Sequence, residues 1–320
     1  MKKNLPLLFL VFTALSFSSN GQSTSAENNV VDEYVKTLGP LDNLNVATIA
    51  DTISRKFDDK KDKVRAIFYW LTNNISWDLK AMKANDPKNN DPVKVIQYRK
   101  ATPLGYSLLL QEMCSLANIR CLSVDGYIKN FPEDINNKPD EINHSWNVVQ
   151  LGQSPEQWFY IDAAKASGYA DKKMSIFTKH FTSEYFFADR TLFNLDHYPN
   201  NGAWQLGGGP KNIKEFFALP VISDAAYEYG LKKLQPATGY LKSKTDKAVI
   251  FSYTYNGKGL SSVVLVIGDE KKGAKSEPMN FSATGSILTF SYQFKKEDEY
   301  PVKVMIDGKE FVSYYIESSE

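Results

Sequence analysis

Apolar residues recur about every 3.6 positions in the first third of the chain, which predicts amphipathic helices over residues 45–57 and from residue 61 to a fading end at Asn73 and Asn74. A third helix is predicted from about residue 103 to 118, directly after a polar run that ends in Thr-Pro. The second of these helices carries one continuous apolar face, made by Val64, Ile67, Phe68 and Leu71. Between the second and third helices, the Asn, Asp and Pro content of residues 86–92 favours a loop.

The spacing changes to alternation further along the chain, which indicates strands. Three strands are predicted at 120–130, 145–151 and 157–164. After about residue 219, apolar and polar residues alternate between turns rich in Gly, Asn, Lys and Asp. Five strands are predicted there, at 247–255, 261–269, 286–294, 300–308 and 309–317. That density of strands in about 100 residues is typical of a β-sandwich.

The first 21 residues have the layout of a cleavable secretory signal peptide, with Lys2 and Lys3 before an apolar run and small polar residues after it. The alternative is an uncleaved anchor helix, but the run is short for a bilayer. No cysteine lies nearby to carry a lipid. We expect a secreted or periplasmic protein with no stable membrane anchor after cleavage. The expected order is signal peptide (1–21), leader and linker (22–45), helical and mixed domain (46–218) and β-sandwich (219–320).

Charge and cysteine content narrow the possible functions. The chain has 38 basic and 37 acidic residues, a formal net charge of +1, which gives no general attraction for nucleic acid. Its only cysteines are Cys114 and Cys121. We expect both to be buried free thiols, because cysteine is often buried even without a bridge. A short disulfide between them is the alternative in an oxidising compartment.

A candidate catalytic pair lies on two neighbouring strands. His144 precedes one apolar strand and Asp162 ends the next, so the carboxylate can hold the imidazole in one tautomer, as in the orienting half of a nucleophile–His–Asp triad. The other histidines, His180 and His197, are interpreted as structural. Neither has a Cys, Asp or Glu at ligand spacing, so no metal site and no cofactor are predicted.

Several motifs in order resemble the transglutaminase-like superfamily, and most closely its kyphoscoliosis-peptidase-like branch. They are PLGYSLL, GYIK, HSWN, WFYIDAAKASG, EYFFADRTLF, HYP and WQL, between about residues 60 and 215. The resemblance implies an α+β fold: a papain/transglutaminase-like core of helices on an antiparallel sheet, followed by an immunoglobulin-like β-sandwich. It also implies acyl transfer by a Cys–His–Asp triad.

The resemblance places His144 on the family's catalytic histidine and Asp162 on its aspartate. Pro103, however, falls on the catalytic cysteine, and Lys165 and Arg190 replace a tryptophan and a proline of the family pattern. Proline suits the first turn of a helix but offers no nucleophile and no N–H. The family's chemistry is therefore not expected of this chain.

Other residues could supply a nucleophile. Cys114 is about 16 Å further along the same helix, which excludes it. Ser107, one turn on, is expected to face the cleft side, and Thr102 flanks the site and can cap the helix. The residues expected to bind a ligand in the cleft are Thr102, Gly105, Tyr106, Ser107, Trp146, Asn147 and Lys165.

The function predicted is that of an exported pseudoenzyme that binds a protein, a peptide or a cell-wall component in the former substrate groove. One alternative is an active hydrolase or acyl transferase that uses Thr102 or Ser107. Another is an inert first domain that leaves binding to the β-sandwich.

Overall fold

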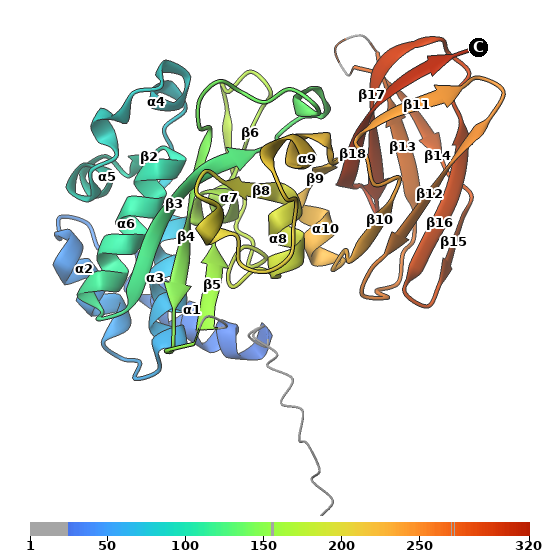
Figure 1. Cartoon of the computed structure of the whole chain (residues 1–320). Helices are drawn as coiled ribbons and strands as arrows, with labels where there is room; N and C mark the ends of the chain where they lie inside the picture. Colours follow the sequence, from blue (N-terminus) through green and yellow to red (C-terminus); the bar gives the residue numbers. More distant parts are fainter. Residues whose placement is uncertain (1–24, 155–156, 270, 272) are drawn as a thin grey trace, which may run out of the picture.

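A computed structural model describes residues 25–320 except 155–156, 270 and 272. The predicted signal peptide lies outside these residues. The described chain has two parts: helices packed on a small sheet, and a β-sandwich beside them (Figure 1). No helix among the described residues is long and apolar enough to cross a membrane.

The three helices predicted from apolar spacing are confirmed. They are α2 (Val46–Ser54), α3 (Lys60–Asn74) and α6 (Pro103–Leu116). The predicted apolar face of α3 is fully buried. The Asp59 side chain begins this helix by accepting hydrogen bonds from the amides of Lys61 and Asp62, which would otherwise lack partners.

Part of the segment 22–45, expected to be a leader and linker, is instead a packed helix, α1 (Ser25–Leu38). Val31 and Val35 bury its apolar side. The Arg65 guanidinium donates to both carboxylate oxygens of Asp32, at 2.8 and 2.6 Å, and this joins α1 to α3. The sequence pattern did not predict this helix, because the segment is mostly polar and the helix buries only a narrow apolar stripe.

The predicted loop at 86–92 also contains helical turns. The elements between α3 and α6 are β1 (Ser76–Trp77), α4 (Leu79–Ala84), η1 (Pro87–Asn89), α5 (Pro92–Tyr98) and β2 (Lys100–Ala101). Asp86 and Asp91 each cap the helix that starts at the following proline. The Asp-Pro pairs that suggested a loop are therefore helix starts.

A four-stranded antiparallel sheet lies against these helices. Its order is β5 (Trp158–Ile161), β4 (His144–Gln150), β3 (Arg120–Ile128) and β8 (His197–Pro199). The three strands predicted here are confirmed, and β8 is an addition. Gly126 on β3 pairs with both His144 and Pro199, and a Cβ at this position would overlap the Tyr198 carbonyl. The glycine thus lets β8 approach β3 and brings this short strand close to the start of β4.

Short elements lie between the strands of this sheet and after them. They are η2 (Pro132–Asp134), α7 (Ala163–Ser167), β6 (Gly168–Ala170), β7 (Phe177–Lys179), α8 (Arg190–Asp196), η4 (Gly202–Trp204), α9 (Ile213–Ala218), β9 (Val221–Ile222) and α10 (Asp224–Glu228).

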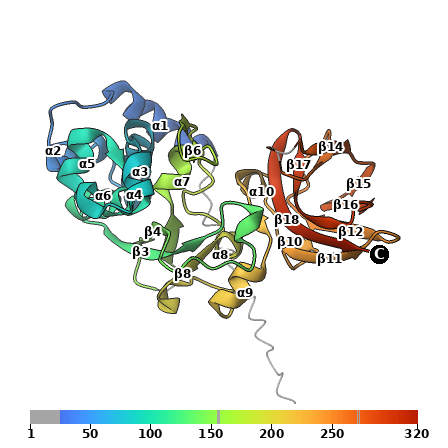
Figure 2. The ribbon, with the colours of Figure 1, turned by 90° about the horizontal axis from the view of Figure 1, so that it is seen from above.

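The C-terminal part is a sandwich of two sheets, and Figure 2 shows it beside the helical part. One sheet has the order β10 (Lys233–Gln235), β12 (Ala248–Thr254), β16 (Ile287–Gln293) and β15 (Phe281–Thr284). The other has the order β11 (Tyr240–Lys244), β18 (Lys309–Ser319), β17 (Asp298–Ile306), β13 (Val263–Ile267) and β14 (Lys275–Pro278), with β9 also paired to β18. Aromatic contacts join the sheets, including Phe251 with Tyr314 and Tyr253 with Phe311.

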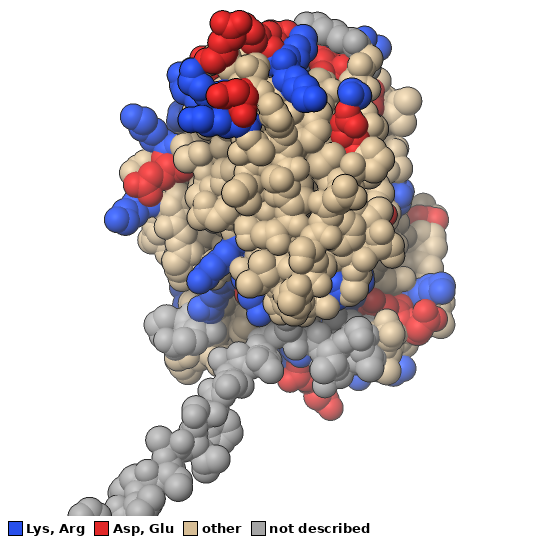
Figure 3. All heavy atoms as spheres, turned by 90° about the vertical axis from the view of Figure 1, so that its right-hand side faces the viewer, with Lys and Arg blue, Asp and Glu red and all other residues tan. Residues whose placement is uncertain are grey.

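The α+β class with a C-terminal sandwich is as predicted. The missed strands are short and mostly polar, as expected for edge positions with little buried surface. Strands β12, β15 and β16 contain no charged residue. Figure 3 correspondingly shows a broad uncharged area on this side of the molecule.

The two parts are joined by side chains as well as by the chain itself. The Tyr185 hydroxyl donates to Asp224 at 2.7 Å, and the Tyr227 hydroxyl donates to Asp196 at 3.2 Å. The rings of Tyr185 and Tyr227 lie 4.8 Å apart. Helix α10 therefore packs against the first part while β9 pairs with the sandwich.

Candidate functional site

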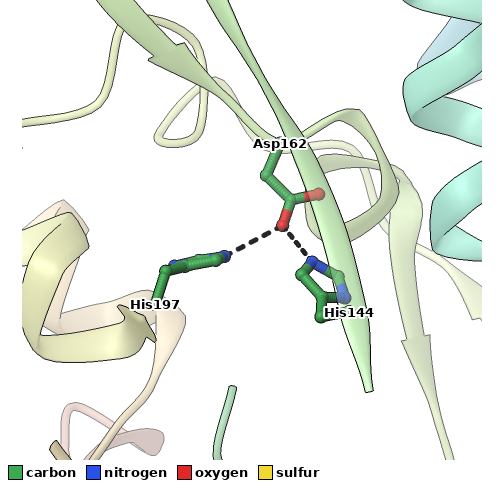
Figure 4. Close-up of side chains that lie close together, drawn as sticks. All are labelled: His144, Asp162 and His197. Atoms are coloured by element: carbon green, nitrogen blue, oxygen red, sulfur yellow. Dashed lines mark hydrogen bonds and ion pairs between the residues drawn. The ribbon is translucent and has the colours of Figure 1, made fainter. Parts of the chain in front are cut away.

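Two histidines converge on one carboxylate (Figure 4). His144 begins β4, Asp162 follows β5, and His197 begins β8. Oδ2 of Asp162 lies 2.5 Å from Nε2 of His144 and 3.0 Å from Nε2 of His197. Oδ1 of Asp162 accepts the Lys165 amide at 2.9 Å, which caps α7. The predicted His144–Asp162 contact is therefore present.

Burial and the two imidazoles set the charge of this centre. Burial alone raises the pKa of Asp162, but His144 and His197 outweigh it and hold that pKa well below its usual value. Burial lowers the pKa of His197, despite the opposing effect of Asp196 and Asp162. Asp162 is thus an anion, and His197 is a neutral imidazole whose Nε2–H donates to it.

The contact of His197 with Asp162 corrects the interpretation of His197 as a loop histidine without an acidic partner. Phe193 stacks on its ring, with 3.8 Å between the ring centroids. Its Nδ1 lies 3.4 Å from Asp196, whose Oδ2 also accepts from Lys165 Nζ at 2.8 Å. In the sequence, the HYP match was the one sign that His197 belongs near the site. Spacing along the chain does not show that β8 joins this sheet.

His144, Asp162 and His197 offer donor atoms within 4.8 Å of one another, and these donor types bind zinc. The distances fit a hydrogen-bonded centre better. Ligands of a tetrahedral zinc ion with bonds of about 2.0–2.1 Å lie roughly 3.3 Å apart. Nε2 of His144 is only 2.5 Å from the Asp162 oxygen. These side chains would have to separate to admit an ion, so no step is assigned to a metal.

A cleft of about 860 Å³ opens beside His144. Its walls include Pro103 and Trp77 from the helical part, Lys165 after β5, and Lys309 from the sandwich. Only 2% of the His144 side chain is exposed, although it is one of the residues that line this cleft. Nδ1 lies across the ring from the Asp162 contact. A second hollow, of about 590 Å³, lies at the other end of β3 and β4 and contains none of the predicted site residues.

The start of α6 presents proline to this cleft. Pro103 is the first helical residue, and Thr102 caps the helix by accepting from the Gly105 amide. The Thr102 hydroxyl donates to the Asn90 side chain at 2.6 Å. Ser107 was expected to face the cleft side. It is instead 1% exposed, and its hydroxyl pairs with that of Ser123 on β3. Neither hydroxyl lines the cleft with His144.

The other residues expected to bind a ligand are mostly packing residues. Tyr106 donates its hydroxyl to the Ile75 carbonyl at 2.7 Å, and a Cβ at Gly105 would lie 3.0 Å from Ala101 Cβ. Asn147 donates to the Ser107 carbonyl at 3.0 Å, so its amide faces α6. Trp146 is buried, with its ring 5.1 Å from that of His197. Of the seven, Lys165 alone is among the residues that line the cleft.

Lys165 adds a cation to the cleft. Burial lowers the pKa of this lysine, but Asp196 and Asp224 more than compensate, and the pKa is raised. Cys114 and Cys121 are both buried free thiols, as expected. Burial raises the pKa of the Cys121 thiol, so this cysteine lacks the character of a reactive nucleophile.

Comparisons with known proteins identify the family of the first part of the chain. Residues 47–163 match the family model described as the transglutaminase-like superfamily. The kyphoscoliosis peptidase of Mus musculus is 29% identical over 220 residues, which cover 66% of this chain and 33% of that protein. The human protein of the same name is 30% identical over 207 residues, covering 62% and 31%. Residues 47–163 form a transglutaminase-like domain of the kyphoscoliosis-peptidase-like branch.

The chain spans about a third of the length of these two curated relatives. Hillarin of Drosophila melanogaster is also similar to this chain, at 26% identity over 183 residues, or 53% of this chain and 22% of that protein. A solved structure titled as a TGase covers 52% of this chain and 37% of its own, with 17% identity and a TM-score of 0.30.

Proposed function

We propose that this chain is an exported transglutaminase-like pseudoenzyme that binds a protein, a peptide or a cell-wall component in the cleft beside His144. One observation carries the proposal: Pro103, at the start of α6, lines the same cleft as His144, which is already hydrogen-bonded to Asp162. A base and its orienting carboxylate are therefore kept together, while the helix start that they face carries a proline in place of a nucleophile.

The arrangement supports binding for physical reasons. The start of a helix favours a thiolate, because its macrodipole and free amides stabilise negative charge. Proline at that position cannot form one. The Thr102 and Ser107 hydroxyls are engaged elsewhere, which disfavours the alternative of a hydroxyl nucleophile. What remains is an enclosed cleft with polar groups at its base, as expected of a ligand site.

The test is to restore a thiol with Pro103→Cys and measure its alkylation by iodoacetamide at pH 7. Because residue 103 lies in the same cleft as His144 and at the helix start, we expect the pKa of its thiol to be depressed. Alkylation should then be roughly tenfold faster than for an ordinary cysteine. Leu104→Cys is the matched control, because it shares the helix start but is not among the residues that line the cleft.

Adding His144→Ala to Pro103→Cys should remove most of the gain. Equal rates for the two engineered thiols would show that residue 103 is not the nucleophile position. Amide hydrolysis or transfer by the purified wild-type protein would show that the chain is an enzyme.

The proposed export has its own test. Expression of the full chain in a bacterium, followed by N-terminal sequencing of the protein outside the cytoplasm, should give a chain that begins near Gln22. A cytoplasmic protein that still carries residues 1–21 would contradict the proposed export.

A further inference from the structure

The two sheets of the sandwich end in four edge strands, which are β10, β11, β14 and β15. An edge strand presents unpaired backbone N–H and C=O groups to which another strand can bond, and proteins discourage such pairing with charged side chains and proline. Three of the four edges carry these residues: Lys233 on β10 with Pro236 directly after it, Lys242 and Lys244 on β11, and Lys275, Glu277 and Pro278 on β14.

Strand β15 has neither charge nor proline. Its four residues are Phe-Ser-Ala-Thr, and it pairs with β16 without a register shift. It lies on the side of the sandwich that faces away from the helical part (Figure 1 and Figure 2). In the part of the chain that the structure describes, this is therefore the sandwich edge that is left open to another strand.

The same edge leaves side chains that face the core open to solvent. Phe281 and Ala283 pair with Phe290 and Leu288 on β16, and the latter two are buried between the sheets. Paired residues place their side chains on the same face of a sheet, so Phe281 and Ala283 also face the core. Ala283 is nevertheless exposed, and Phe281 is only partly buried. A further strand at this edge would cover both.

The hairpin geometry shows which backbone groups are free. Strands β15 and β16 are joined by a two-residue turn between Thr284 and Ile287, and residues that flank such a turn bond to each other. Bonding alternates along an antiparallel strand, so the N–H and C=O of Ala283 point away from β16. A second strand can use these groups without disturbing the hairpin.

A second copy of the same strand suits this edge. Two antiparallel copies of β15 are related by a twofold axis, so each bonds to the other through the same groups and the contact closes on itself. Such a contact brings identical residues together, which disfavours charge. Strands β12, β15 and β16 are uncharged, as is the broad area in Figure 3. Lys275 and Glu277, on the adjoining β14, pair with each other.

We propose that two copies of this chain associate edge to edge through β15, which joins their four-stranded sheets into one continuous antiparallel sheet. This inference does not depend on the proposed binding function. The paired strands are short, so the dimer should be weak, with a dissociation constant on the order of 10–100 μM. The helical parts, which contain the clefts, would lie on the outer sides of the dimer.

Sedimentation velocity of the mature chain, from about 1 to about 300 μM, measures the association. The wild type should change from monomer to dimer over this range and form nothing larger. Ala283→Pro removes the outward N–H, and proline is tolerated on an edge strand where that N–H faces solvent. It should weaken association at least about tenfold. Ala283→Lys, which leaves the backbone free, should weaken it as well by placing like charges together. Unchanged circular dichroism shows that each variant keeps its fold.

Ile250→Lys is the matched control. Ile250 is 67% exposed on the outer face of β12, so this variant adds the same charge to the face of the sheet and not to its edge. It should dimerise like the wild type. If Ile250→Lys weakens association at least as much as the Ala283 variants, copies do not meet at β15 and the inference fails. A wild type that stays monomeric over the whole range, or that forms species larger than a dimer, would also overturn it.

Discussion

Lys129, directly after β3, is a buried lysine whose replacement tests the electrostatics of the fold. It is 2% exposed, its Nζ donates to the Phe216 carbonyl at 2.9 Å, and it lies 3.6 Å from the centre of the Phe216 ring. The carbonyl and the ring favour the charged form. Burial nonetheless lowers the pKa of Lys129 to about 7, against partial compensation from Asp196 and Asp134.

This pKa sets the size and sign of the effect. The pKa falls from 10.5 in the unfolded chain to about 7 in the fold. That difference of about 3.5 units corresponds to roughly 5 kcal/mol, at 1.36 kcal/mol per unit. Between pH 7 and 10.5 the unfolded chain binds more protons, so this lysine makes the protein more stable as pH rises. Below pH 7 the lysine is charged in both states, so the full cost of burying that charge lowers the stability of the fold.

Lys129→Met removes the titration and keeps an apolar stem. The variant should gain most over the wild type at or below pH 7. Its advantage should shrink by about 3 kcal/mol between pH 6.5 and 9. Urea unfolding of both proteins at pH 6.5, 7.5 and 9.0 measures the difference. Exposed Lys214 on α9 supplies the control, Lys214→Met, which should show a nearly constant difference. A constant difference for Lys129→Met as well would refute the reasoning.

Two further substitutions test buried charge pairs. Asp162→Asn should cost about 3–5 kcal/mol at pH 7, because it leaves the His144 and His197 donors without their shared anion. Since the pKa of Asp162 is depressed in the fold, its stabilisation is lost as pH falls below about 4, and the deficit of the variant should shrink there. A deficit in urea unfolding that is independent of pH would contradict this. Arg65→Met should cost a similar 3–5 kcal/mol by leaving Asp32 unpaired, and Asp32→Leu in the same chain should recover most of that loss. A double variant as unstable as the single one would show that the ion pair is not the cause.

How far the sequence predicts this structure depends on where each element buries its surface. Helix α3 and strand β4 present strong apolar patterns, because one face or both are covered, and both were predicted close to their observed bounds. Helix α1 buries only a narrow stripe and an ion pair, and β15 buries little at the sheet edge. Local pattern carries little information about such elements.

The prediction of the site from the sequence was limited in the same way. His144 and Asp162 could be paired from the sequence, because they lie on consecutive strands. His197 joins them through the pairing of β8 with β3, which crosses about 70 residues of chain. The side that Ser107 faces was predicted wrongly. Helical spacing gives the direction of a side chain around the helix axis, but it does not show that Ser123 lies in that direction. The side of the cleft that α10 lines could not be predicted either, because the position of this helix is set by contacts with both parts of the chain.

The pairing of β9 with β18 has a consequence for protein synthesis. Val221 and Ile222, just before α10, pair with Ser313 and Val312, which are synthesised about 90 residues later. The side of the cleft nearest the sandwich is thus completed only after β18 has been synthesised. A premature stop codon before residue 309 would remove that support. The shortened protein would bind its ligand differently, even though it still contained His144, Asp162 and Pro103.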